Sequence, residues 1–101
     1  MSRHRKELIK TLLSIKTEEE MEDFLLGILT PRELAEIPTR LEIVKLLKNG
    51  IPQHEIAEKL GVGVATVTRG SREIQRGRFK AIKSETSWRS PTNRRLTPAM
   101  K

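Results

Sequence analysis

Few side chains in this sequence have the chemistry that catalysis needs. The 101 residues include no cysteine and no tyrosine, and the two histidines stand apart at His4 and His54. No glycine-rich loop of the kind that holds phosphates is present. The acidic residues crowded between positions 18 and 23 follow Thr17, where they favour the start of a helix over a metal site. The inventory therefore predicts neither an enzyme nor a bound metal ion.

In the segment from residue 53 to residue 72, small and apolar residues recur at the spacing of a helix-turn-helix. Ala57 is small where two helices would cross, and Gly61 stands where a tight turn favours a positive φ. The other four positions of the pattern are apolar: Ile56, Leu60, Val62 and Val67. A chance helical hairpin seldom meets all of these requirements, so the segment is predicted to bind DNA.

The second helix of this motif would run from Val64 to about Gln75 and turn its first residues toward base edges in the major groove. Small side chains there suit thymine methyl groups and bridging water, so base readout is expected to be modest and partly indirect. Gln53 and His54, at the start of the preceding helix, would reach a phosphate or a flanking base. Lys59 and Arg72 would contact phosphates. The predicted DNA contacts are Gln53, His54, Lys59, Val64, Ala65, Thr68 and Arg72, with plain solvent exposure as the alternative for each.

The net charge of +7 lies entirely near the carboxyl-terminal end. Residues 1–75 hold 12 basic and 12 acidic side chains, whereas residues 76–101 hold 8 basic side chains against Glu85 alone. Such a segment would be drawn to a polyanion through counterion release, and a solvated, disordered end is the alternative. We predict a helical DNA-binding domain over residues 1–76 and a basic, flexible tail over residues 77–101.

Helical periodicity runs through much of the sequence before this motif. Apolar residues recur at helical spacing over residues 3–15, and again over residues 18–28 after a cap at Thr17. No alternation with a period of two reaches a useful length, and at most a short helix spans residues 78–88. The sequence therefore predicts an all-α fold of five to six helices.

Prolines and a glycine mark the expected starts and ends of helices in the middle of the chain. Thr30-Pro31-Arg32-Glu33 is a capping box with proline at the first helical position, which begins a short helix. Pro38 is expected to end that helix, so a further helix would begin near Thr39 and end at Gly50.

The size and composition of the chain indicate its cellular compartment and its oligomeric state. Apolar runs are far shorter than the roughly 20 residues of a membrane span, and the absence of cysteine fits a reducing compartment. We expect a cytoplasmic protein with no membrane partner. A chain this short, with only three aromatic residues (3%), builds a thin core, so we also expect an intertwined homodimer.

Taken together, these residues resemble the bacterial tryptophan repressor family over roughly residues 20–75. The most telling part is Ala65-Thr66-Val67-Thr68-Arg69-Gly70-Ser71, because glycine inside a helix costs about 1 kcal/mol relative to alanine. Its presence indicates that something packs against the helix backbone. The other matching positions are Leu29-Thr30-Pro31, Thr39-Arg40, Ile43-Val44, Leu47, Gly50, Gln53, Glu55, Leu60-Gly61 and Gly63.

The resemblance implies a pocket for free L-tryptophan between the recognition helix and the core. Arg40 and Arg69 would flank the indole ring, a role that suits planar guanidinium groups, which also pair with carboxylates. Without such a site, Arg40 is a solvated residue at a helix start and Arg69 a phosphate contact. The implied ligand residues are Arg40, Arg69, Thr66, Gly70 and Thr30, with backbone carbonyls near Gly27 and Leu29 for the ammonium.

Two positions depart from the family. Glu73 stands where the family has a serine near the ligand amine, so its carboxylate would either bind the ammonium or disturb the pocket. Ala57 replaces a lysine that faces DNA. The resemblance still implies a transcriptional repressor that binds operator DNA as a homodimer, with L-tryptophan as corepressor and no other cofactor. The alternative is a ligand-independent helix-turn-helix regulator of the same fold superfamily.

Overall fold

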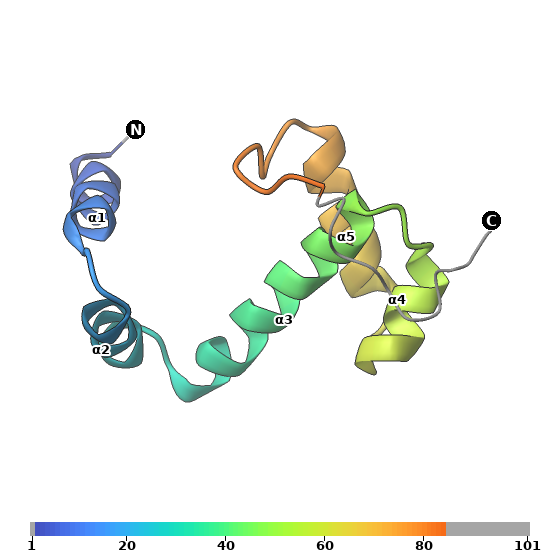
Figure 1. Cartoon of the computed structure of the whole chain (residues 1–101), viewed down its shortest axis with the longest axis horizontal. Helices are drawn as coiled ribbons and strands as arrows, with labels where there is room; N and C mark the ends of the chain where they lie inside the picture. Colours follow the sequence, from blue (N-terminus) through green and yellow to red (C-terminus); the bar gives the residue numbers. More distant parts are fainter. Residues whose placement is uncertain (1, 85–101) are drawn as a thin grey trace. The chain divides into compact units, whose positions relative to one another are not determined.

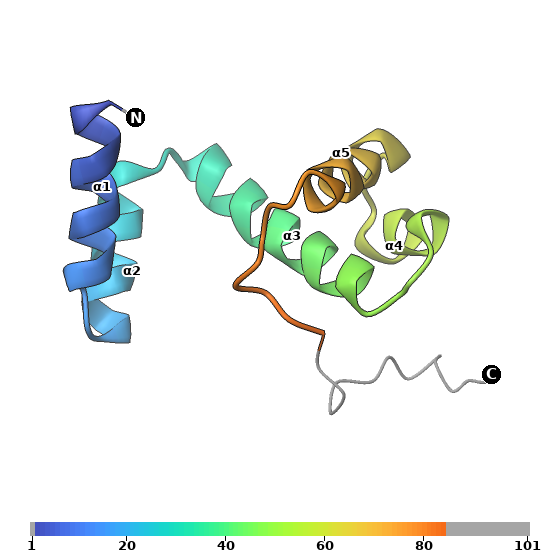
Figure 2. The same cartoon turned by 90° about the horizontal axis from the view of Figure 1, so that it is seen from above.

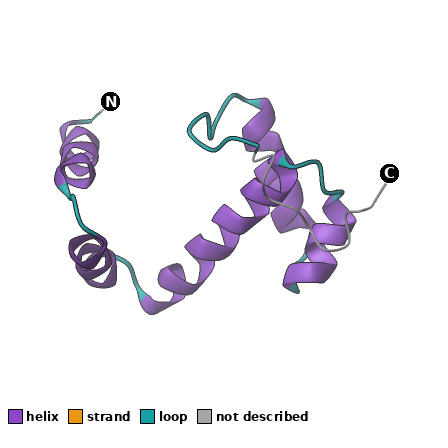
Figure 3. Cartoon of the chain, viewed as in Figure 1, coloured by secondary structure: helices purple, strands orange, loops and turns teal. Residues whose placement is uncertain are grey.

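A computed structural model of the protein describes residues 2–84. Within them lie five helices: α1 Arg3–Ser14, α2 Glu18–Ile28, α3 Pro31–Lys48, α4 Gln53–Leu60 and α5 Val64–Gln75 (Figure 1). These described residues form no strand (Figure 3). The predicted all-α fold is therefore confirmed. Its contacts divide the chain into two compact units, residues 1–38 and residues 39–101.

The first unit has capped helices but no core of its own. Ser2 and Thr17 cap α1 and α2 by accepting hydrogen bonds from the backbone N–H groups of Arg5 and Glu20, each at 3.1 Å. None of residues 2–38 is buried. The large apolar side chains that stay exposed are Leu8, Ile9, Leu13, Leu26, Ile28 and Ile37. Short amphipathic helices of this kind need a partner surface to remain folded.

The α3 helix runs unbroken through Pro38, so the predicted helix break at that residue is wrong. The helix begins with the predicted capping box, in which Thr30 Oγ1 accepts from the Glu33 N–H at 3.1 Å and Glu33 Oε1 accepts from the Thr30 N–H at 2.9 Å. The box stabilises the turns before the proline, and burial of Ile43 and Leu46 stabilises those after it. The helix therefore continues although proline donates no backbone hydrogen bond. Two predicted helices have become one, and the five helices of residues 2–84 lie within the predicted five to six.

The second unit buries a small core where α3, α4 and α5 meet (Figure 2). Ile43 and Leu46 of α3 pack with Ile56 of α4 and Val67 of α5, and each of these side chains is at most 2% exposed. The partly buried residues around them are Leu47, Ile51, Ala57, Leu60 and Val62. Of the apolar positions of the predicted helix-turn-helix, Ile56 and Val67 thus belong to the core of this unit, and the other two pack against it.

Two glycines in left-handed conformation make the connections on either side of α4. Gly50 has φ +84° after α3, and Gly61 has φ +67° between α4 and α5. The N–H of Gly61 caps α4 by donating to the carbonyls of Ala57 and Glu58. Because glycine adopts this conformation without a steric penalty, the tight turn of the motif forms as its sequence predicts.

The chain after α5 turns back to the end of α3 without forming a helix (Figure 1). The short helix predicted over residues 78–88 is therefore absent from residues 78–84, and its remainder lies outside the described residues. The same holds for residues 85–101 of the predicted tail. Among residues 2–84, every helix is too short or too polar to span a bilayer.

Candidate ligand pocket and recognition helix

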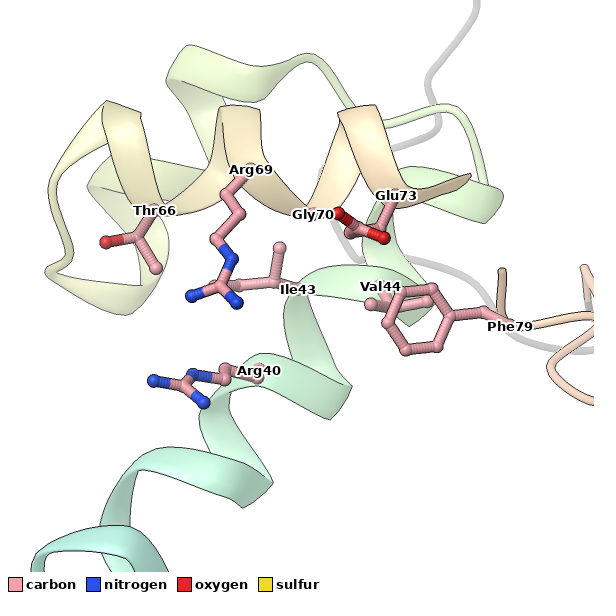
Figure 4. Close-up of a pocket in the computed structure, with 8 residues that line it drawn as sticks. All are labelled: Arg40, Ile43, Val44, Thr66, Arg69, Gly70, Glu73 and Phe79. Carbon is pink, nitrogen blue, oxygen red and sulfur yellow. The ribbon is translucent and has the colours of Figure 1, made fainter. Parts of the chain in front are cut away.

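A pocket of about 280 Å³ opens between α3 and α5 in the second unit (Figure 4). Its lining residues are Arg40, Ile43, Val44, Thr66, Arg69, Gly70, Glu73 and Phe79. Ile43 and Val44, each 2% exposed, form an apolar base, and polar side chains surround it. The size lies just below the usual range of small-molecule sites, so the pocket suits a small ligand such as a free amino acid.

Two arginines stand at one end of this pocket. Arg40 extends from α3 and Arg69 from α5, and the two guanidinium groups face each other across the gap between the helices (Figure 4). With the residues that the structure describes, the Arg69 side chain forms no hydrogen bond or ion pair. Two planar cations placed in this way can stack on an aromatic face and can also pair with a carboxylate. The arrangement favours an anionic or zwitterionic ligand with a ring.

The opposite end of the pocket carries a carboxylate. Glu73 Oε2 accepts a hydrogen bond from Arg76 at 2.9 Å, and Glu73 Oε1 lies 3.5 Å from the Arg78 guanidinium. The Glu73 side chain is 26% exposed, whereas its two partners are mostly exposed. The ion pairs screen the negative charge, and a carboxylate keeps further acceptor positions for an ammonium group. Glu73 is therefore compatible with a zwitterionic ligand.

Gly70 lies where α5 passes closest to α3. A Cβ at this position would lie 3.4 Å from both Ile43 Cγ2 and Leu47 Cδ1. These side chains are the groups packed against the helix backbone, as the glycine in the sequence indicates. The absence of a side chain also leaves the α5 backbone open along the pocket.

The pocket brings together five of the eight residues predicted to bind the ligand. Gly27, Leu29 and Thr30 belong to the first unit and do not line it, and the Thr30 hydroxyl caps α3. Ile43, Val44 and Phe79 line the pocket but were not predicted to do so. The two aliphatic residues have the pattern of ordinary core, whereas an isolated aromatic residue in a basic segment was a sequence feature that could have indicated Phe79.

The predicted DNA contacts are spread along α4 and α5: four of the seven lie at the helix beginnings, whereas Lys59 and Arg72 lie in the last turns. Gln53 and His54 open α4, and Val64, which is 54% exposed, opens α5. Thr68 Oγ1 donates a hydrogen bond to Gln53 Oε1 at 2.8 Å, so the two helices are joined on this side. The other predicted contacts are the exposed residues Lys59, Ala65 and Arg72. Exposure of this kind permits contact with DNA, and these assignments stay predictions.

The chain is similar to one family of known proteins over most of its length. The model of a family described as Trp repressor protein matches residues 3–84. A Trp operon repressor homolog of Vibrio vulnificus is 42% identical over 69 residues, which cover 66% of this chain and 68% of that protein. A Trp operon repressor homolog of Actinobacillus succinogenes is 38% identical over 73 residues, covering 71% of this chain and 72% of the relative. No solved structure matches the chain.

Proposed function

This chain belongs to the Trp repressor protein family, and we propose on that premise that it represses transcription by binding operator DNA when L-tryptophan occupies the pocket between α3 and α5. The role is regulatory rather than enzymatic. The observation that carries the proposal is the pocket itself, which gathers Arg40, Thr66, Arg69, Gly70 and Glu73 beside the recognition helix.

The side chains of the pocket match the parts of tryptophan. In the proposal, Arg40 and Arg69 hold the indole face and the carboxylate, because guanidinium groups interact with both. The apolar base of Ile43 and Val44 takes the hydrocarbon part of the ring, and Glu73 accepts from the ammonium. Thr66 and the backbone at Gly70 line the α5 side of the pocket, where they would lie beside the bound ligand. Backbone carbonyls near Gly27 and Leu29, with Thr30, remain proposed contacts.

Ligand binding would act on DNA through the position of α5. Arg69 and Thr66 are on α5, whereas Arg40 is on α3, so a ligand that contacts all three fixes the tilt of one helix against the other. The beginning of α5, from Val64 to Thr68, is then held at one angle for the major groove. The coupling must be reciprocal, with a typical factor of roughly 5- to 150-fold in each affinity.

We also propose that the protein is a homodimer. None of residues 2–38 is buried, and large apolar side chains of α1 and α2 such as Leu13 and Leu26 are exposed. A second copy would cover these faces, and a helix-turn-helix dimer reads two half-sites about one DNA turn apart. Sedimentation of the full chain with DNA tests this, and a monomer at micromolar concentration would contradict it.

Calorimetric titration of L-tryptophan into the full chain tests the ligand site. Arg69→Ala should abolish binding while leaving the far-ultraviolet circular dichroism unchanged, because the exposed Arg69 is not part of the core. Arg72→Ala is the matched control: it lies on the same helix, is exposed and does not line the pocket. Arg72→Ala should bind tryptophan normally and bind DNA more weakly.

A duplex selected from random DNA by the tryptophan-loaded protein then tests the coupling. Its affinity should rise on addition of saturating tryptophan in the unaltered chain and should not change in Arg69→Ala. Equal affinity with and without tryptophan in the unaltered chain would contradict the corepressor role. The ligand-independent helix-turn-helix regulator would then be the correct description.

A further inference from the structure

The residues after α5 are anchored to both helices that border the pocket. Residues 77–84, here called the strap, begin with the Arg78 N–H donating to the Glu73 carbonyl of α5 at 2.9 Å. Lys48, the last residue of α3, donates from Nζ to the Phe79 carbonyl at 2.6 Å. The described part of the basic carboxyl-terminal segment is therefore held against the pocket by specific hydrogen bonds.

These anchors surround Phe79. The Ser84 hydroxyl hydrogen-bonds the Lys48 carbonyl, so Lys48 contacts the strap at Phe79 and again beyond it. Phe79 has φ +63° and is the one non-glycine residue with a positive φ between residues 2 and 84. L-residues with bulky side chains rarely adopt this conformation, and it persists only where surrounding contacts impose it. The strap thus holds Phe79 in an unfavourable backbone conformation.

That conformation places the Phe79 ring at the pocket. The ring lies at the end opposite the two arginines, beside Glu73 and over Val44 (Figure 4). Phe79 is 40% exposed, so much of the ring surface is still accessible. The hollow of about 280 Å³ remains with the ring in place, so Phe79 forms a wall of the pocket and does not fill it.

We infer that Phe79 is a specificity-determining residue, whose ring is a fixed wall for the far edge of an aromatic amino-acid side chain that Arg40 and Arg69 flank at the other end of the pocket. The inference rests on the proposed function. Two aromatic rings attract one another in offset or edge-to-face arrangements beyond the effect of buried area, and an aliphatic side chain gains no such term. Lys48 is a positioning residue, because its ammonium contacts the Phe79 backbone and the residue does not line the pocket.

Calorimetry with L-tryptophan and three variants of the full chain measures the contribution of the ring. Phe79→Leu keeps an apolar side chain but removes the ring, and it should weaken binding by about 2- to 12-fold, the range of one aromatic pair. Phe79→Tyr keeps the ring and should bind like the unaltered chain. Lys80→Ala is the control within the strap, because this exposed neighbour does not line the pocket.

Trypsin provides a second measurement that does not depend on affinity alone. Arg78 and Lys80 flank Phe79, so L-tryptophan packed against the ring should slow cleavage after both residues in the unaltered chain. The protection should be lost in Phe79→Leu at saturating tryptophan. Lys48→Met, which keeps the stem but not the ammonium, should speed cleavage in the absence of ligand and weaken tryptophan binding.

The outcomes separate the inference from the proposed function. If the unaltered chain does not bind L-tryptophan, the proposed function fails and the inference fails with it. If the chain binds but Phe79→Leu binds equally well, or Phe79→Tyr binds as weakly as Phe79→Leu, only the inference is overturned. Weakened binding in Phe79→Leu, rescue in Phe79→Tyr and ligand protection of the strap together support it.

Discussion

Replacing Gly70 with alanine separates the stability of the second unit from its affinity for the ligand. Alanine is favoured over glycine inside a helix by about 1 kcal/mol. The new Cβ would meet Ile43 Cγ2 and Leu47 Cδ1 at 3.4 Å, slightly inside the optimum of about 3.5–4.0 Å at which a carbon pair gains about 0.1–0.2 kcal/mol. The contacts of the new Cβ therefore change the stability little. The higher helix propensity of alanine decides that the free energy of unfolding should rise.

We expect Gly70→Ala to raise the free energy of unfolding by about 1 kcal/mol, which corresponds to about 4–8 °C in Tm for a domain of this size. Urea and thermal unfolding followed by circular dichroism, at one protein concentration and without ligand, measure this change. Because Gly70 lines the pocket, the same methyl group would reduce the space for the ligand. The affinity for L-tryptophan, measured by calorimetry, should therefore fall.

Gly27→Ala is the matched control for the helix term. Gly27 lies in α2, has no atom within 4 Å of the position of an added Cβ, and does not line the pocket. Gly27→Ala should therefore raise the free energy of unfolding through helix propensity alone, because the new methyl group would contact no neighbouring side chain. A lower unfolding free energy in Gly70→Ala together with a higher one in Gly27→Ala would refute the reasoning, because it would mean that α3 and α5 are too close to accept a methyl group.

Three further changes test other parts of the structure. Thr30→Ala removes one bond of the capping box and should lower the free energy of unfolding by about 1 kcal/mol in urea denaturation. Thr68→Val removes the hydrogen bond to Gln53 and should weaken binding to a selected DNA duplex while tryptophan affinity stays unchanged; a loss of both affinities would argue against separate sites. Deleting residues 85–101 removes four basic side chains and should reduce the slope of log affinity against log salt by up to about 3.6, and an unchanged slope would exclude phosphate contacts from this segment.

The helix-turn-helix could be predicted because its determinants are local. The small residue at the helix crossing, the glycine in the turn and the apolar positions each act within a few residues of the chain. Gly61 adopts a positive φ, and Ile56 and Val67 are fully buried, as the spacing requires. The capping box at Thr30 is local in the same way.

The two features that the sequence did not reveal depend on contacts distant in the chain. The rule that ended a helix before Pro38 considers only the neighbours of the proline, whereas the continuity of α3 also depends on burial of residues such as Leu46 against α4 and α5. Phe79 reaches the pocket through Lys48, which lies 31 positions earlier. An isolated aromatic residue in a basic segment marks Phe79 as unusual, but no local pattern encodes the hydrogen bond that brings it to the pocket.

Ile43 belongs at once to the buried core, to the contact with Gly70 and to the base of the pocket. Replacing it with a smaller residue to admit another ligand would cost about 0.5–5 kcal/mol of a total stability of only about 5–15 kcal/mol. Glu73 and Phe79 are part of no such core, so they can change with little loss of stability. Selection for a new ligand would therefore act first on the rim of the pocket, where Glu73 and Phe79 lie.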